Sequence, residues 1–268
     1  MPDGLAFESV TAGYASRVAL RGATFGVRPG EVVGLVGPNG SGKTTAVRVA
    51  SRALRPRGGR VLVAGHDPYR LPARRAARLT AVVPQEVAPT FEFTAGELVL
   101  MGRTPYLSTF GGGTADDHRL VREALETAGV QELVDRQLAD LSGGEKQRVI
   151  LAQALAQDAP ILLFDEPTTH LDLRHLVQIL GTMRSLAASG RAVLSVFHDL
   201  NVAAASCDRL VVLDRGAVVA DDTPNVVVTP ALLRDVYGVE AEVHEHAVTG
   251  RPTVYVAIGD RIRTRQPG

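Results

Sequence analysis

Short runs rich in Val, Leu and Ile recur along the chain, and each is bounded by Gly, Pro or charged residues. Such runs are typical of strands; they lie at 31–37, 60–65, 79–85, 161–166, 192–198 and 209–216. Helical patterns occur between most of them, at 44–54, 116–128, 143–157, 173–188 and 200–206. Apolar strands separated by helices predict an α/β core whose strands are covered on both faces by crossover helices.

Two regions depart from this alternation. The first roughly 30 residues, together with 57–65, contain strand-like stretches around turns, which is typical of a small antiparallel sheet. A predicted helical lobe, from about 86 to 158, interrupts the strands, with a loop from Pro105 to Thr114 that contains Gly111, Gly112 and Gly113. The predicted division is a domain over 1–238, made of 1–85, 86–158 and 159–238, and a short strand-like tail over 239–268.

Composition narrows the classes of function. With 268 residues, 45% of them hydrophobic, the chain can bury a full core. Lys plus Arg number 29 and Asp plus Glu number 29, so no net basic field favours nucleic acid as a partner. The lone Cys207 is expected to be a buried small hydrophobe. Since no run of about 18 apolar residues could span a membrane and no secretory leader is evident, we expect a cytoplasmic protein.

A phosphate loop is the most specific chemical motif. It lies after the apolar run at 31–37 and before the helical pattern at 44–54, as the motif requires. Glycines allow successive backbone N–H groups to face one anion, and the helix adds its positive end. Lys43 is expected to pair with phosphate oxygens, and Thr44 to offer a hydroxyl to Mg²⁺. The candidate ATP-binding residues are Gly37, Pro38, Asn39, Gly40, Ser41, Gly42, Lys43, Thr44 and Thr45.

Two acidic residues end the apolar run at 161–166. Asp165 and Glu166 are therefore expected at a strand end, where open α/β sheets bind ligands. Asp165 is a candidate to hold Mg²⁺, and Glu166 a candidate to orient or deprotonate an attacking water. Alone, the pair would be the start of a solvated loop; the phosphate loop in the same chain gives it weight.

The segment Leu141–Glu145 opens a long helical pattern. Ser142 with Glu145 three residues later forms a capping-box pattern, and the exposed glycines Gly143 and Gly144 leave the helix start open to an anion. This segment, LSGGEKQRVILAQAL, resembles the signature of ABC transporter ATPases, and GPNGSGKTT and ILLFDEP resemble that family's Walker A and Walker B motifs. The resemblance covers nearly the whole chain and implies a P-loop NTPase (RecA-like) core with a β subdomain and an inserted helical subdomain.

The same resemblance assigns roles to further residues. It implies that Tyr14 stacks on adenine, that Gln85 contacts Mg²⁺ or water at the hinge of the helical lobe, and that His198 contacts the γ-phosphate. It places the D-loop at Thr169–Asp172. Taken singly, an ordinary strand tyrosine, a strand-end glutamine and a satisfied core histidine are the more usual readings of such positions.

By resemblance, two such subunits pair head to tail, and each ATP lies between the phosphate loop of one copy and the signature of the other. Ser142, Gly143, Gly144, Glu145 and Asp172 then act in trans. Glu145 departs from the commonest signature, in which Gln is frequent. Function is expected to survive because the backbone and Ser142 supply the phosphate donors, although the charge is expected to weaken contacts across the interface. The helical lobe, especially 96–107, is expected to receive a separate polytopic membrane permease.

The sub-family resemblance is to importer ATPases for ferric siderophores, haem and cobalamin, carried by LVLMGRTPYL, EPTTHLDLRH and FHDLNVAA. It implies location at the cytoplasmic face of the membrane and an indirect link to a substrate-binding protein. The alternatives are a soluble ABC ATPase of iron–sulfur cluster assembly and a phosphate-loop kinase, although a kinase has no use for LSGGE. His244 and His246 share one strand face, but two ligands are too few for a metal site.

Overall fold

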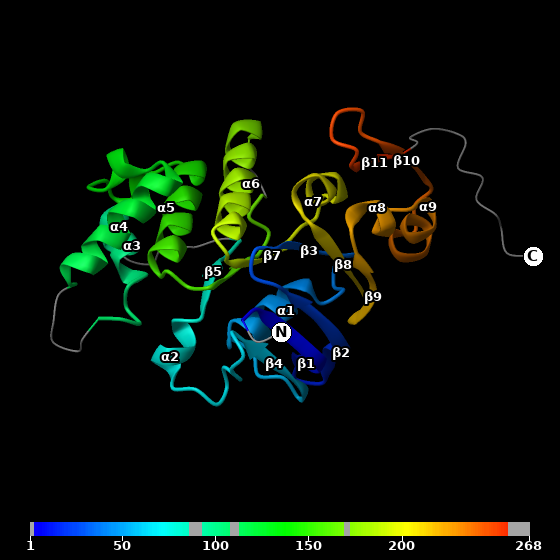
Figure 1. Ribbon diagram of the computed structural model, residues 1–268, viewed down its shortest axis with the longest axis horizontal. Coiled ribbons are helices and arrows are strands. Elements are labelled where there is room, and N and C mark those ends of the chain that lie inside the picture. The colour runs from blue at the N-terminus through cyan, green and yellow to red at the C-terminus, as the bar shows by residue number, and fades with distance from the viewer. Residues whose placement is uncertain (1–2, 86–92, 108–112, 169–171, 257–268) are drawn as a thin grey trace, which may run out of the picture.

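A computed structural model describes residues 3–85, 93–107, 113–168 and 172–256. Its centre is a six-stranded sheet in the order β5-β6-β7-β3-β8-β9, in which only β9 runs antiparallel to its neighbour (Figure 1). The strands are β3 (Val32–Val36), β5 (Thr80–Val83), β6 (Ile161–Phe164), β7 (Ala192–Val196), β8 (Arg209–Asp214) and β9 (Ala217–Asp222). The predicted α/β core is confirmed.

Alternate residues of this sheet face two separate hydrophobic cores, as the twofold repeat of a strand requires. Val33 and Leu35 of β3 pack in the core that contains α1 (Lys43–Ala50) and the β subdomain. Val32 and Val36 pack in the core that contains α6 (Leu173–Ala188), α7 (Leu200–Ser206) and the helical lobe. The absence of polar alternation in the sequence therefore reflects burial on both faces.

The predicted antiparallel sheet of the N-terminal region is confirmed. It has the order β2-β1-β4 and consists of β1 (Leu5–Tyr14), β2 (Arg17–Val27) and β4 (Gly58–Val63). Phe7 and Phe25 stack between β1 and β2 with ring centroids 4.3 Å apart. The helix predicted at 44–54 ends earlier, at Ala50, because Arg52 adopts a left-handed φ of 66° that cannot continue a helix.

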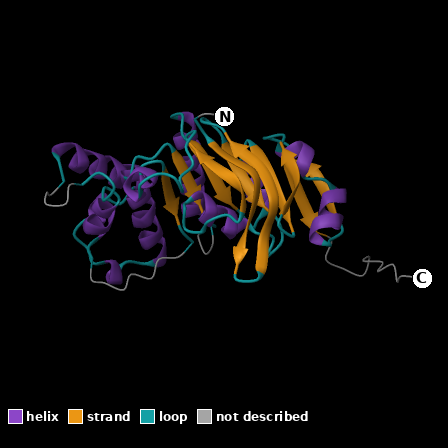
Figure 2. Cartoon of the chain, turned by 90° about the horizontal axis from the view of Figure 1, so that it is seen from below, coloured by secondary structure: helices purple, strands orange, loops and turns teal. Residues whose placement is uncertain are grey.

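The inserted helical lobe is also confirmed and lies beyond β5 at one end of the molecule (Figures 1 and 2). Short α2 precedes β5, and the lobe itself follows it. The helices are α2 (Ala73–Ala77), α3 (Ala95–Met101), α4 (Ala115–Ala128) and α5 (Gly143–Ala156), with 3₁₀ turns η1 (Gln131–Leu133) and η2 (Leu138–Asp140). Capping boxes begin α3, α4 and α5, so side chains of each helix satisfy the backbone N–H groups of its N-cap and N3 residues. Gly111 and Gly112 of the predicted loop lie outside the described residues.

The C-terminal part folds back onto the other end of the sheet (Figure 1). It comprises α8 (Pro224–Val227), α9 (Pro230–Leu232), the π-helical turn η3 (Leu233–Tyr237) and the strands β10 (Ala241–Glu245) and β11 (Pro252–Val256). The two strand-like stretches of the tail form one antiparallel hairpin. Over the described ranges, no helix is long and apolar enough to cross a bilayer, and no cluster of His, Cys, Asp or Glu has a metal-binding arrangement.

Candidate nucleotide-binding site

The phosphate loop connects β3 to α1 and depends on glycine geometry. Gly37, Gly40 and Gly42 have φ values of 142°, 79° and 112°, which side-chain-bearing residues rarely adopt. A Cβ at Gly37 would lie 2.0 Å from the carbonyl oxygen of Leu213. Gly42 is the N-cap of α1 and provides no side-chain acceptor, so the first N–H groups of α1 are open to an anion.

Lys43 is held inside this loop. Its Nζ donates hydrogen bonds to the carbonyl oxygens of Gly37, at 2.7 Å, and Pro38, at 3.1 Å. Burial lowers the pKa of Lys43, while the nearby carboxylates of Glu166 and Asp165 act in the opposite direction. The ammonium is thus bound by two neutral acceptors, which a phosphate oxygen can replace with a charge-assisted bond.

Three neighbouring parallel strands end beside the loop. Val83 of β5 is in register with Phe164 of β6, which is in register with Ser195 of β7. The chain beyond these strands carries, in spatial order, Gln85, the Asp165–Glu166 pair and His198. The sheet topology therefore brings together four predicted residues from three distant parts of the sequence.

Asp165 has the character expected of a metal ligand. Burial raises its pKa, the adjacent Glu166 raises it further, and a hydrogen bond from Thr44 lowers it. Its Oδ1 is buried and has no hydrogen-bond partner in the described part of the chain. A buried carboxylate oxygen without a donor, next to a threonine hydroxyl, matches the hard-oxygen ligand set of Mg²⁺.

Glu166 and His198 form a close pair. His198 Nε2 lies 2.6 Å from Glu166 Oε1, and the side chains are 47% and 10% exposed, respectively. Glu166 has a positive φ of 55°, a left-handed conformation that costs free energy in a residue with a Cβ. The backbone is thus strained at the residue whose carboxylate faces both the histidine and the phosphate loop.

These elements enclose a cavity of about 260 Å³. Its lining comes from the end of β1, the start of β2, the phosphate loop, the start of α1 and the segments after β6 and β7: Tyr14, Arg17, Ala19, Asn39, Gly40, Gly42, Lys43, Thr44, Thr45, Glu166 and His198. Gly37, Pro38, Ser41, Gln85 and Asp165 were predicted as site residues but do not line the cavity. Ser41 is buried beneath the loop, and Gln85 is exposed at the last described position before residue 93.

Tyr14 stands at the cavity mouth and is 40% exposed. Its hydroxyl accepts a hydrogen bond of 3.0 Å from Arg48, whose guanidinium lies 5.7 Å from the ring centroid. Arg17 and Ala19 were not predicted as site residues. Arg17 could have been suspected from the sequence, because it is a cation three positions after Tyr14. Only the pairing of β1 with β2 shows that the Arg17 side chain reaches Gly40.

The predicted signature lies on a different surface, since none of its residues lines the cavity. The Ser142 hydroxyl donates to Glu145 Oε2 at 2.6 Å, the Ser142 amide donates to the same atom at 2.8 Å, and these bonds lower the pKa of Glu145. A side chain at Gly143 would meet no atom within 4 Å, so this turn is open. Asp172 caps α6, and Thr169–Leu171 of the predicted D-loop lie outside the described residues.

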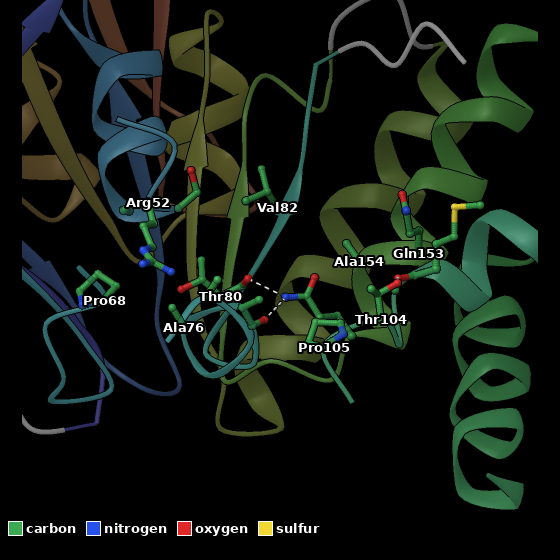
Figure 3. A pocket seen from close by; sticks show the side chains of 16 residues that line it. Arg52, Pro68, Ala76, Thr80, Val82, Thr104, Pro105, Gln153 and Ala154 are labelled. Carbon is green, nitrogen blue, oxygen red and sulfur yellow. Dashed lines mark hydrogen bonds between the residues drawn. The ribbon is translucent and has the colours of Figure 1, made fainter. Parts of the chain in front are cut away.

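A second cavity of about 400 Å³ lies between the core and the helical lobe (Figure 3). Arg52, Pro68 and Ala76 line it from the core side, and Met101, Thr104 and Pro105 line it from the lobe. Gln157 crosses between the two parts, because its Nε2 donates to the carbonyl oxygens of Ala77 and Thr80, the latter at 2.8 Å. We call this cavity the interlobe groove.

Comparisons with known proteins agree with this geometry. A family model described as "ABC transporter" matches residues 20–169. The hemin import ATP-binding protein HmuV of Nocardia farcinica is 43% identical over 251 residues, covering 94% of this chain and 86% of that protein. The iron(3+)-hydroxamate import ATP-binding protein FhuC of Bacillus subtilis is 37% identical over 251 residues, covering 93% of each.

The cobalamin import ATP-binding protein BtuD of Halobacterium salinarum is 44% identical over 229 residues; the match covers 85% of this chain but 57% of that relative's length. Among solved structures, an inward-facing metal-chelate type ABC transporter is similar with a TM-score of 0.81, 22% identity and coverage of 95% of this chain and 96% of that one. A dimeric ATP-binding cassette bound to ADP and phosphate has a TM-score of 0.71 and 27% identity, with coverage of 82% and 98%.

Proposed function

The chain belongs to the ABC transporter family, and from this premise we propose that it is the ATP-hydrolysing subunit that drives import of a metal chelate through a separate membrane permease. The observation that carries the proposal is the Glu166–His198 pair, which faces the glycine-rich phosphate loop across one cavity. The named relatives import haem, iron hydroxamate and cobalamin, which are all metal chelates, and this supports the cargo class.

ATP would bind in the cavity through groups already arranged for it. The open N–H groups of the loop and of α1 would take the β- and γ-phosphates, and Lys43 would exchange its two carbonyl acceptors for phosphate oxygens. Tyr14 would offer its exposed ring to adenine. Asp165, Thr44 and Gln85 would hold Mg²⁺, which when bound neutralises phosphate charge.

Hydrolysis would depend on the carboxylate of Glu166. It would accept a proton from a water molecule as that water attacks the γ-phosphorus; the bond to the β-phosphate oxygen breaks, and ADP and phosphate leave. His198 would donate a hydrogen bond to the γ-phosphate and hold the attacking water against Glu166. Because His198 Nε2 and Glu166 Oε1 are in direct contact at 2.6 Å, the two side chains would separate to admit the attacking water between them.

A second copy of the chain would complete the site. Ser142, Gly143, Gly144, Glu145 and Asp172 lie away from the cavity of their own chain, which is the arrangement that a head-to-tail homodimer needs. The open turn at Gly143 would face the γ-phosphate bound by the partner. The likeness to a solved dimeric cassette supports this pairing.

The interlobe groove would receive a helix of the permease. It lies where the core and the helical lobe meet, so a change in their relative position would move whatever occupies it. The subunit would then act at the cytoplasmic face of the membrane, and a substrate-binding protein would contact the permease rather than this chain.

The test is reconstitution of the chain with the membrane protein that co-purifies with it, followed by ATPase assays with binding proteins loaded with candidate chelates. We expect stimulation by one chelate class and loss of turnover in Glu166→Gln by at least about 100-fold with ATP binding retained. Co-purification with a soluble scaffold instead would favour iron–sulfur cluster assembly. Near-normal turnover of Glu166→Gln would refute the assignment of the base.

A further inference from the structure

The C-terminal hairpin of β10 and β11 is joined to the start of α7 by one side chain. The backbone N–H of Val254 donates to Asn201 Oδ1 at 2.7 Å, and Asn201 Nδ2 donates to the Val254 carbonyl oxygen at 3.2 Å. The amide of Asn201 thus pairs with both backbone groups of one residue, as a neighbouring strand would. These two hydrogen bonds fix the first turn of α7 against β11.

The hairpin also holds the other end of α7. Arg251 Nη1 donates to the carbonyl oxygen of Cys207, the C-cap of α7, at 3.0 Å. Carbonyl groups at a helix C-terminus lack donors within the helix, and a cation there is favourable. Val243 and Val254 pack against the core that contains Ala203 and Cys207. The hairpin therefore contacts α7 at both ends.

Helix α7 is connected to His198 by a single residue. That residue, Asp199, caps the helix by accepting hydrogen bonds from the backbone N–H groups of Asn201, at 2.7 Å, and Val202, at 3.2 Å. In the ranges that the structure describes, Glu166 is the one hydrogen-bonding or ion-pairing partner of the His198 ring. Since the ring is 47% exposed, its position depends mainly on its backbone, which lies between β7 and α7.

We propose that the hairpin over 241–256 is a positioning element for hydrolysis, in which Asn201 and Arg251 hold α7 so that His198 stays in place against Glu166. The inference rests on the proposed function, because it takes His198 and Glu166 to act on ATP. Neither Asn201 nor Arg251 lines the nucleotide cavity, so their effect passes through α7. Loss of either contact should lower kcat and leave the KM for ATP unchanged.

The test compares two hairpin contacts in the full-length chain. Asn201→Ala removes both bonds to Val254, whereas Asn225→Ala removes a bond of 2.8 Å from α8 to the Gly250 carbonyl oxygen and leaves α7 untouched. We expect Asn201→Ala to lower kcat about tenfold, since small displacements of a reacting group are costly. Its KM and the affinity for a non-cleavable ATP analogue should change by less than about twofold, and Asn225→Ala should match wild type.

A conservative variant and a double mutant separate positioning from general damage. Asn201→Asp keeps the acceptor for the Val254 amide and should retain more activity than Asn201→Ala. In a His198→Ala background, Asn201→Ala should cause no further loss, because the group that it positions is gone. Equal kcat in Asn201→Ala and Asn225→Ala, or losses that multiply in the double mutant, would overturn the inference. Wild-type kcat in His198→Ala alone would instead overturn the proposed function.

Discussion

Replacement of Arg103 by alanine should destabilise the helical lobe far more than removal of an exposed arginine. Arg103 is 4% exposed; its Nε donates to Asp117 Oδ1 at 2.8 Å and its Nη1 to the Ala156 carbonyl oxygen at 2.8 Å. Its guanidinium also lies 3.9 Å from the ring centroid of Tyr106. The substitution leaves a buried carboxylate without its cation, which costs about 3–5 kcal/mol of unfolding free energy. For a domain of this size, the melting temperature should fall by roughly 6–20 °C.

Urea unfolding at neutral pH measures this loss as a lower midpoint at unchanged slope. The matched control is Arg119→Ala in the same lobe, where an arginine that is 48% exposed pairs with Asp116 and Glu123. Because solvent screens exposed ion pairs, its loss should leave the urea midpoint almost unchanged. A loss for Arg103→Ala as small as that of the control would refute the reasoning.

The pH dependence of the same variant is a second check. Hydrogen bonds from Arg103 and Thr114 hold the pKa of Asp117 at about 2, below its ordinary value of 3.8. A lowered native-state pKa stabilises the fold above the unfolded-state value, and this contribution disappears as the pH falls from about 4 to 2. The difference between wild type and Arg103→Ala should therefore be constant from about pH 5 to 8 and shrink below about pH 4.

Three further outcomes follow from the nucleotide site and its surroundings. Lys43→Ala should abolish detectable ATP binding in a calorimetric titration, and unchanged affinity would contradict the role of the loop. Glu145→Gln removes a charge beside the open turn at Gly143 but keeps a capping-box residue. ATP-dependent dimerisation, measured by light scattering in a Glu166→Gln background, should therefore strengthen severalfold. Unchanged dimerisation would show that the charge does not face the nucleotide. Burial raises the pKa of Cys207 to about 12, so its thiol should resist iodoacetamide at pH 8 until the protein unfolds; rapid labelling of the native protein would contradict this burial.

The sequence predicted the parts of the fold that depend on local patterns. Strand positions, the phosphate loop and the inserted lobe follow from apolar runs and glycines that lie close together in the chain, and membership of the ABC transporter family is confirmed by the comparisons. The predicted end of α1, at residue 54, was wrong, because Arg52 has a left-handed conformation that the local sequence does not predict. Distant Tyr69 contacts the chain on both sides of Arg52: its hydroxyl lies 2.7 Å from the Val49 carbonyl oxygen and 2.5 Å from that of Leu54.

Contacts between distant segments could not be predicted in the same way. Arg17 reaches the phosphate loop only because β1 and β2 pair, and the interlobe groove is lined by residues of α2 and α3 that are distant in the sequence. The roles of the site residues and the predicted boundary between 1–238 and 239–268 stay predictions. The structure shows that the hairpin of the tail packs against α7, so a contribution of residues beyond 238 to ATP hydrolysis can be tested.

The register of β5, β6 and β7 has a mechanical consequence. Val83, Phe164 and Ser195 are neighbours across three hydrogen-bonded strands, and the backbone N–H of Asp165 donates to the Val83 carbonyl oxygen at 2.9 Å. The end of β5 is therefore hydrogen-bonded directly to the strand end that carries Asp165 and Glu166. A shift of the end of β5 would therefore act on the acidic pair through one backbone hydrogen bond.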